Sequence, residues 1–223
     1  TAEEESSGPN GLNSLLKNLP NIDVAIVGEP TQMQLAIAEK GLVVFDAVVK
    51  GTAGHAAHPN NDNPILKSMD VMQWFQNLQF DKVSETLGPV KLTITQINAG
   101  SQHNVVPSQV NLVLDVRVNE CYTNQEIADI VSQAPCDLTP RSLRLKSSSI
   151  DKKHPLVVAG IAMGRNTYGS PTLSDQAALS CPSLKLGPGD STRSHTADEF
   201  IYTEEIKEAV RLYIELLDQV ITS

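Results

Sequence analysis

The chain has 223 residues, of which 40% are hydrophobic and 19% charged, a composition typical of an ordinary globular protein. Its formal net charge of −9 argues against nucleic acid and anionic membranes as partners, because both need a basic face. No apolar run approaches the ~20 residues that a membrane helix needs. Cys121, Cys136 and Cys181 form no Cys-x-x-Cys pair, so we expect reduced thiols in a cytoplasmic protein and no zinc site built from cysteine.

The N-terminal part predicts a helix followed by a buried strand. Residues 11–19 have helical character, and the apolar run IDVAIV (22–27) is stopped by Gly28, Glu29 and Pro30. In open α/β sheets, ligands bind beyond the carboxyl ends of the strands. Glu29 is therefore expected where chemistry takes place.

The middle of the chain predicts a separate domain at about 40–148. Its elements follow the order β-α-β-β-α-β, which is the ferredoxin-like arrangement. We expect Ile65, Met69, Met72 and Gln76 to mark one face of its first helix. The predicted elements are strands at 41–51, 90–100, 109–118 and 142–146, and helices at 64–78 and 123–133.

The remaining segment returns to the first domain, which would comprise 1–39 and 149–223. A helix is predicted at PLVVAGIAMGRN, and a strand is predicted to end at Gly187–Gly189. The last 20 or so residues have the pattern of an amphipathic helix. Its expected buried stripe consists of Ile206, Val210, Tyr213, Leu217 and Val220.

Four residues could form part of a metal site. Glu4, Glu5, Glu29 and His195 each lie in or beside a loop of glycine, proline or small polar residues. Carboxylate and imidazole groups are typical zinc ligands in hydrolytic sites, and a second glutamate beside a ligand can act as a general base. The alternatives are a solvated acidic turn and a surface histidine.

Two further positions have both a functional and a structural interpretation. His55 lies among small residues in GTAGHAAHP, so it either reaches a substrate or lies in an exposed loop. Arg117, in the strand LDVRV, either binds a substrate carboxylate or forms an ion pair within the sheet.

In combination, the motifs resemble the family of dinuclear zinc exopeptidases and deacylases. The resemblance covers the whole chain. It implies a three-layer α/β/α catalytic domain, truncated at its N-terminus, with an inserted ferredoxin-like lid and dimerisation domain. The motifs that carry it are TAEEESSG, VGEPT, GTAGHAAHP, NVVPSQVNLVLDVRV, GSPTLSDQAAL and LGPGDSTRSHTADEF.

The resemblance assigns a metal site with two zinc ions per subunit, Co²⁺ being an alternative. Glu3 takes the leading acidic position of the motif, Glu4 is the general base and Glu5 is a metal ligand. Glu29 and His195 are the other two ligands.

It also implies a homodimer formed through the inserted domain. His55 would reach across to the partner's substrate, while Asn104 and Arg117 would bind the substrate's polar groups and carboxylate.

The implied substrate is an N-acyl amino acid. GPGD and SHTADEF look closest to acetylornithine deacetylase, which implies hydrolysis of N-acetyl-L-ornithine in arginine biosynthesis. Succinyl-diaminopimelate, acetylcitrulline and dipeptide or aminoacylase substrates stay open. The family's His-x-Asp motif and bridging aspartate precede the glutamate pair, so we expect this chain to be the C-terminal part of a longer enzyme. The alternative is a non-catalytic dimerisation module.

Overall fold

The structure is a computed structural model that describes residue 8 and residues 10–221. The chain divides into two compact units. The middle unit comprises Gly41–Ser84 and Gly88–Lys146, and the terminal unit comprises Thr1–Lys40, Glu85–Leu87 and Ser147–Ser223. Their assignment to a lid domain and a catalytic domain stays a prediction.

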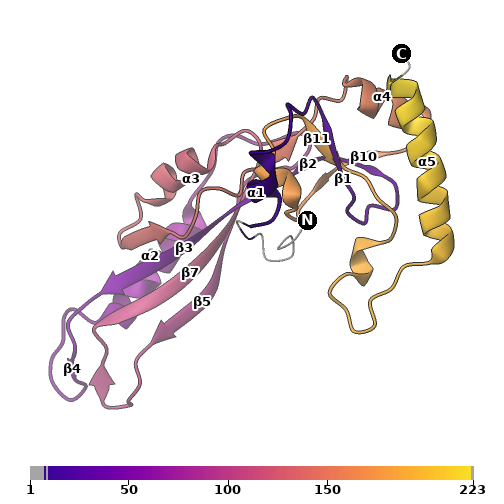
Figure 1. The fold of residues 1–223 in the computed structure, drawn as a ribbon. Helices are drawn as coiled ribbons and strands as arrows, with labels where there is room; N and C mark the ends of the chain where they lie inside the picture. Colours follow the sequence, from indigo (N-terminus) through magenta and orange to yellow (C-terminus); the bar gives the residue numbers. More distant parts are fainter. Residues whose placement is uncertain (1–7, 9, 222–223) are drawn as a thin grey trace. The chain divides into compact units, whose positions relative to one another are not determined.

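The middle unit is a four-stranded antiparallel sheet in the order β5-β7-β3-β8 (Figure 1). This order, with one helix after the first strand and one after the third, is the predicted ferredoxin-like arrangement. A separate two-stranded antiparallel sheet pairs His55 of β4 with Val105 of β6. The elements are β3 (Gly41–Lys50), β4 (Gly54–His55), α2 (Pro64–Asn77), β5 (Lys91–Ala99), β6 (Val105–Val106), β7 (Gln109–Val118), α3 (Asn124–Val131) and β8 (Asp137–Pro140).

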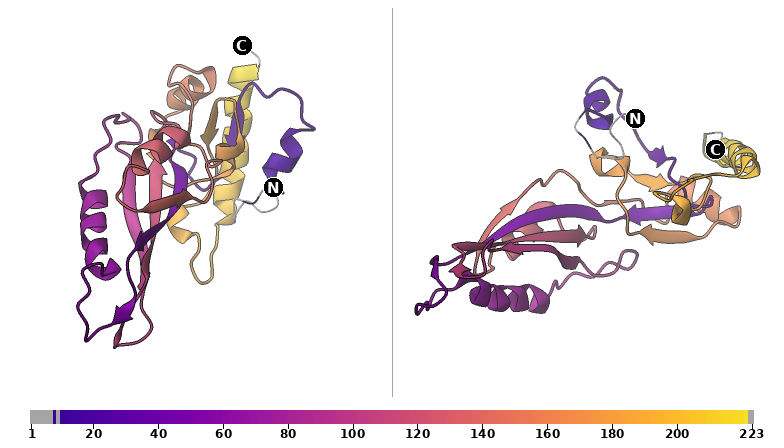
Figure 2. Two further views of the ribbon diagram at one scale, coloured as in Figure 1. Left: turned by 90° about the vertical axis from the view of Figure 1, so that its left-hand side faces the viewer. Right: turned by 90° about the horizontal axis from the view of Figure 1, so that it is seen from below.

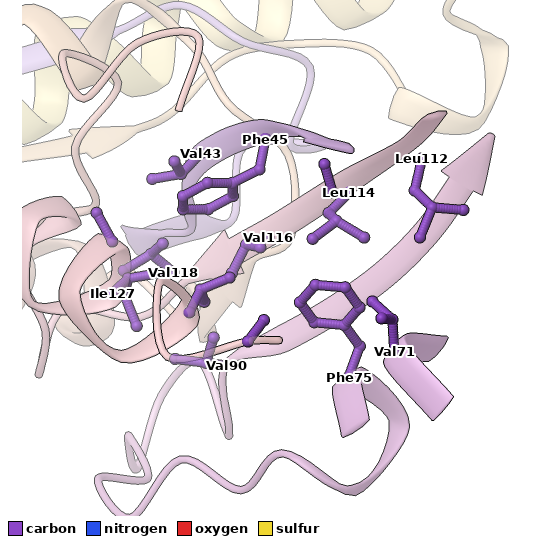
Figure 3. Close-up of a cluster of buried hydrophobic side chains, with 14 of the residues drawn as sticks. Val43, Phe45, Val71, Phe75, Val90, Leu112, Leu114, Val116, Val118 and Ile127 are labelled. Carbon is purple, nitrogen blue, oxygen red and sulfur yellow. The ribbon is translucent and has the colours of Figure 1, made fainter. Parts of the chain in front are cut away.

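One face of this sheet carries the core of the middle unit. Alternate residues of β3 and β7 are buried, because successive side chains of a strand point to opposite faces. Val71 and Phe75 of α2 and Ile127 of α3 pack onto that face (Figure 3). Figure 2 shows α2 running along the strands. The alternation seen in the sequence therefore identifies the covered face of β3 and β7.

Two details of the middle unit differ from the prediction. The face of α2 that packs on the sheet includes Val71 and Phe75, whereas Ile65 and Met69 are exposed. The predicted strand at 142–146 is wrong, because the edge strand is β8 at Asp137–Pro140. Residues 142–146 are held instead by Asn124, whose Nδ2 donates to the carbonyls of Leu143 and Leu145.

The terminal unit contains a mixed sheet in the order β1-β11-β2-β10, with β9 pairing with β2. β1 and β11 are parallel, as are β2 and β10. Helices α4 and α5 contact each other, and their buried side chains share one core with β2 and β11. The elements are α1 (Leu12–Leu16), β1 (Ala25–Val27), β2 (Leu35–Glu39), β9 (Ser148–Ser149), α4 (Pro155–Ala162), β10 (Thr167–Ser170), the 3₁₀ turns η1 (Asp175–Ala178) and η2 (Ser191–Arg193), β11 (Ser183–Lys185) and α5 (Thr203–Ile221).

Two features of the terminal unit were not predicted correctly. β2 is buried at all five positions, and the sequence analysis assigned no strand to it. The buried face of α5 contains Ala209, Leu212 and Leu216, whereas Ile206 and Val210 of the predicted stripe are exposed. The apolar residues of α5 cover more than one face, so helical spacing alone does not fix the buried one.

The start of α3 provides a pH-dependent contact. Hydrogen bonds from Lys82, and from the Thr123 backbone and hydroxyl, lower the pKa of Glu126 from 4.5 to about 2. A carboxyl group whose pKa is lowered on folding stabilises the native state above its unfolded pKa. We therefore expect this stabilisation to be lost as the pH falls from 4.5 to about 2. NMR titration of the Glu126 carboxyl should find the low pKa, and Lys82→Met should raise it; a native value near 4.5 would contradict the contact.

Candidate active site

A cavity of the terminal unit has a volume of about 420 Å³ and is lined by two of the predicted metal ligands. Glu29 follows β1, and His195 lies in the loop between β11 and α5. The cavity therefore lies beyond the carboxyl ends of parallel strands, where α/β sheets bind ligands. Its lining consists of Gly28, Glu29, Pro30, Thr31, Tyr168, Ser170, Pro171, Thr172, Leu173, Lys185, Ser191, Ser194, His195 and Glu199.

Backbone contacts between two strand ends position Glu29. The backbone N–H of Leu186 donates to the carbonyl of Val27, and that of Thr31 donates to the carbonyl of Gly187. Gly187 lies so close to this turn that a Cβ atom added there would be 2.5 Å from the Glu29 carbonyl oxygen. A glycine is therefore required for the turn to carry Glu29 in this position.

Hydrogen bonds to Asp190 connect the turn after Glu29 with the loop that contains His195. Gln32 Nε2 donates to Asp190 Oδ2 at 2.6 Å, while Asp190 Oδ1 accepts from the Thr192 backbone. These contacts, with the Thr192 backbone bond the largest, lower the pKa of Asp190. His195 has a left-handed backbone, with φ of 58°, and its N–H donates to Glu199 Oε2. Such a conformation costs a non-glycine residue about 1–3 kcal/mol and is common at functional sites.

Arg193 anchors the same loop to the start of α5. Its Nη1 donates to both carboxylate oxygens of Glu205, at 3.1 and 2.8 Å. The guanidinium group also lies over the rings of Phe200 and Tyr202, 5.0 and 4.9 Å from their centroids. An ion pair combined with two cation–π contacts restrains the backbone on either side of His195.

Polar residues that the sequence analysis did not identify form another part of the cavity lining. They are Tyr168 and Ser170 on β10, Thr172 after β10 and Lys185 on β11. Burial raises the pKa of Tyr168, so its phenol is protonated at neutral pH and can donate a hydrogen bond. A lysine between two leucines in SLKL was the signal that could have revealed Lys185, because buried lysines are rare unless paired.

The other predicted site residues lie outside this cavity. Glu3, Glu4 and Glu5 lie outside the described residues. His55 and Asn104 belong to the middle unit, where the backbone N–H of Ala56 donates to the Asn104 carbonyl. The structure therefore brings His55 and Asn104 together at the small β4–β6 sheet, and His55 is exposed there.

Arg117 forms an ion pair within its own strand. Its Nε and Nη2 donate to the two carboxylate oxygens of Asp115, at 2.8 and 3.0 Å. Arg117 and Asp115 share a face of β7 because they are two residues apart. A substrate-binding role for Arg117 stays a prediction, and a substrate carboxylate would compete with Asp115 for the same guanidinium group.

The donor set of the cavity fits a zinc site in part. Glu29 and His195 supply a carboxylate and an imidazole, both common zinc ligands. Among residues 8 and 10–221, no group of three or more His, Cys, Asp or Glu side chains has the geometry to hold a metal ion. These two residues would therefore hold zinc only together with further ligands, for which the sequence analysis names Glu5.

Comparison with known proteins shows two likenesses. Residues 37–135 match the family model of the peptidase dimerisation domain. The chain is 26% identical, over 95% of its length, to a succinyl-diaminopimelate desuccinylase of Ehrlichia ruminantium. The chain thus shares a peptidase dimerisation domain with known proteins and is similar to a desuccinylase over most of its length.

Solved structures show the same fold. An aminopeptidase PepT from Bacillus cereus superposes with a TM-score of 0.77 at 17% identity, covering 99% of this chain and 63% of that one. The YXEP protein of Bacillus subtilis, described as a dinuclear metal binding peptidase from the M20 family, superposes with a TM-score of 0.66 at 18% identity, covering 98% and 62%. These likenesses confirm the predicted α/β fold class with an inserted dimerisation domain.

The likeness does not extend over the whole length of the relatives. The chain spans 60% of the length of the Ehrlichia desuccinylase. No helix within the described part of the chain is both long and apolar enough to cross a membrane.

Proposed function

We propose that the complete protein is a metal-dependent amidohydrolase that cleaves the amide bond of an N-acyl amino acid. The observation that carries this proposal is the shared cavity of Glu29 and His195, two ligand-type residues from distant parts of the chain. The likeness to a succinyl-diaminopimelate desuccinylase supports it. Glu5 is proposed as a further ligand, with two zinc ions per subunit.

The proposed mechanism gives each residue a separate task. Bound zinc would supply Lewis-acid chemistry and make water a stronger nucleophile at neutral pH. Glu4 is proposed to take a proton from the attacking water and to pass it to the departing amine. The protonated phenol of Tyr168 can donate a hydrogen bond to a substrate oxygen in the cavity.

His55 is proposed to act on the substrate of a partner subunit. Its Nδ1 accepts from the backbone N–H of Ala57, which leaves Nε2 to donate when the ring is neutral. Such a donor stabilises an oxyanion that exists only in the transition state. His55→Ala with unchanged turnover would therefore disprove this role.

We propose N-acetyl-L-ornithine as the first substrate to test. The GPGD and SHTADEF motifs support an N-acetylated amino acid, whereas the Ehrlichia relative supports a succinylated one. Acetylcitrulline and dipeptides are further alternatives. Pocket residues that differ by one polar contact can discriminate among such ligands, so each must be assayed.

The test is release of free amine by the complete, zinc-loaded protein. N-acetyl-L-ornithine, N-succinyl-diaminopimelate, N-acetylcitrulline and a dipeptide are compared at equal concentration. Turnover of one of them, abolished by a chelator and restored by zinc, supports the proposed function. A protein that binds about two zinc ions and hydrolyses none of the four would disprove the proposed substrate class. A protein that binds no metal would favour the non-catalytic module.

We also propose a homodimer formed through the middle unit. α2 presents three exposed apolar residues, Ile65, Leu66 and Met69, with exposed fractions of 43%, 61% and 62%. β5 is an edge strand of the neighbouring sheet, and Ile97 on it is 54% exposed. An apolar stripe beside an open strand edge is a surface that another chain can cover.

Leu66→Asp/Met69→Asp is expected to convert the dimer to a monomer, because it places two charges in an apolar interface. Light scattering coupled to size-exclusion chromatography measures the mass. Lys152→Glu is the matched control, because it changes the net charge by the same amount at an exposed position of the terminal unit. A double variant that stays dimeric would show that the interface lies elsewhere.

A further inference from the structure

A buried ion pair joins Lys185, which lines the candidate cavity, to Glu39. Lys185 on β11 and Glu39 on β2 have side chains that are 2% and 0% exposed, and Nζ lies 3.0 Å from Oε2. Burial raises the pKa of Glu39, an effect opposed by the neighbouring Lys185. Neither residue belongs to the metal-ligand set that the M20 resemblance assigns.

The pair is directly bonded to the segment that forms one wall of the cavity. We call residues 170–174 the wall segment; Ser170–Leu173 of it line the cavity. Lys185 Nζ donates to Ser170 Oγ at 3.1 Å, and to the carbonyl and hydroxyl of Thr172 at 3.0 and 3.1 Å. Glu39 Oε2 accepts from the hydroxyl of Ser174 at 2.7 Å. The two charged groups therefore hold both ends of the wall segment.

These contacts leave Lys185 little capacity to bind a ligand itself. An ammonium group has three N–H donors, and here they are shared among four protein acceptors on Glu39, Ser170 and Thr172. The contact between Lys185 and the Ser170 hydroxyl also raises the alternative of a catalytic serine–lysine dyad. Such a dyad needs an amine that is available to the hydroxyl, whereas this one is shared with Glu39 and Thr172. Lys185 is therefore a positioning residue and not a catalytic one.

Stability alone is a poor explanation of the pair. Replacing a buried ion pair with apolar residues of similar volume is often neutral or stabilising, because the desolvation of two charges offsets their attraction. Glu39 Oε1 also makes no hydrogen bond within the described part of the chain, although it is buried. A buried charged pair in which one carboxylate oxygen has no hydrogen bond costs folding free energy. Its presence is explained if the pair is needed to orient the neighbouring loop.

We infer that the Glu39–Lys185 pair positions the wall segment so that the candidate cavity can bind its ligand. The ligand's identity rests on the proposed function, whereas the ordering of the wall segment does not. The pair would act by fixing the Thr172 carbonyl and the Ser170 and Thr172 hydroxyls, which are polar groups at the cavity lining.

The test is the double variant Glu39→Leu/Lys185→Met in the complete protein. It removes both charges at once and so avoids the buried unpaired charge that either single variant would leave. The first measurement is amide hydrogen exchange of the wall segment, where the Thr172 N–H donates to Ser170 Oγ. The second is KM and kcat for whichever N-acyl amino acid the wild type hydrolyses. The matched control is Asp46→Leu/Arg141→Met, which removes an exposed ion pair of the middle unit.

We expect the double variant to remain folded, with exchange of the wall-segment amides about tenfold faster or more. KM should rise by a similar factor with a smaller change in kcat, and the control should match the wild type. A double variant with unchanged exchange would overturn the inference, as would faster exchange with unchanged KM. A wild type without activity would disprove the proposed function only, and the exchange data would still decide whether the pair orders the wall segment.

Discussion

His195→Ala is expected to lower the zinc affinity of the complete protein by more than about 100-fold. Loss of a residue that merely supports a ligand typically costs about 10–100-fold in metal affinity, so loss of a ligand should exceed that range. Glu199→Gln tests a weaker, indirect effect on the same site. Glu199 Oε2 accepts a hydrogen bond from the His195 backbone N–H, so the substitution would change the position of His195 without removing its imidazole. We expect about tenfold for that variant.

Competition with a chromophoric chelator measures these affinities without reference to any substrate. His103→Ala is the control, because His103 is an exposed histidine of the middle unit with no assigned role. Equal affinities of His195→Ala and the wild type would remove His195 from the metal site. An effect of Glu199→Gln as large as that of His195→Ala would indicate that the loop, and not the imidazole, is what binding requires.

Phe45→Ala is expected to destabilise the middle unit by about 3–5 kcal/mol. Phe45 is completely buried in β3, where its ring lies in the cluster shown in Figure 3. Removal of a buried aromatic ring loses its transfer free energy and leaves a cavity that the sheet cannot fill. For a unit of about 100 residues, this loss should lower the melting temperature by more than about 10 °C.

Trp74 allows this change to be observed in the middle unit alone. It is the only tryptophan of the chain, and it lies on α2 against the same core. Thermal unfolding followed by its fluorescence should therefore report the loss. Val44→Ala is the control, because Val44 lies on the half-buried opposite face of β3 and should cost about 1 kcal/mol. Similar shifts for Val44→Ala and Phe45→Ala would contradict the assignment of the covered face.

The strands that were predicted correctly can be identified from the apolar and polar pattern of their own residues. β3 and β7 alternate between apolar and polar residues because only one face of their sheet is buried. The predictions failed where the apolar pattern fits two structures. Leu143 and Leu145 alternate like a strand, although Asn124 holds their carbonyls in an irregular segment. In α5, the exposed residues Ile206 and Val210 have the same helical spacing as the buried residues, so spacing does not distinguish the two sets.

The candidate site shows a similar division. Glu29 and His195 belong to recognisable motifs, and the sequence predicted that they would act together. Lys185 was missed because its significance depends on Glu39 and Thr172, which come from separate elements and share no motif with it. Sequence analysis identifies residues that carry chemistry, whereas the residues that orient them become visible only when distant segments are placed side by side.

The close approach of Gly187 to the Glu29 turn affects how relatives should be compared. A methyl group at position 187 would collide with the Glu29 carbonyl, so the turn would have to move and carry its side chain with it. A homologous chain could retain every proposed metal ligand and every proposed catalytic residue, and still bind metal poorly because position 187 is not glycine. Surveys that sort active members from inactive ones should therefore record whether this position is glycine, even though it contributes no side chain to the cavity.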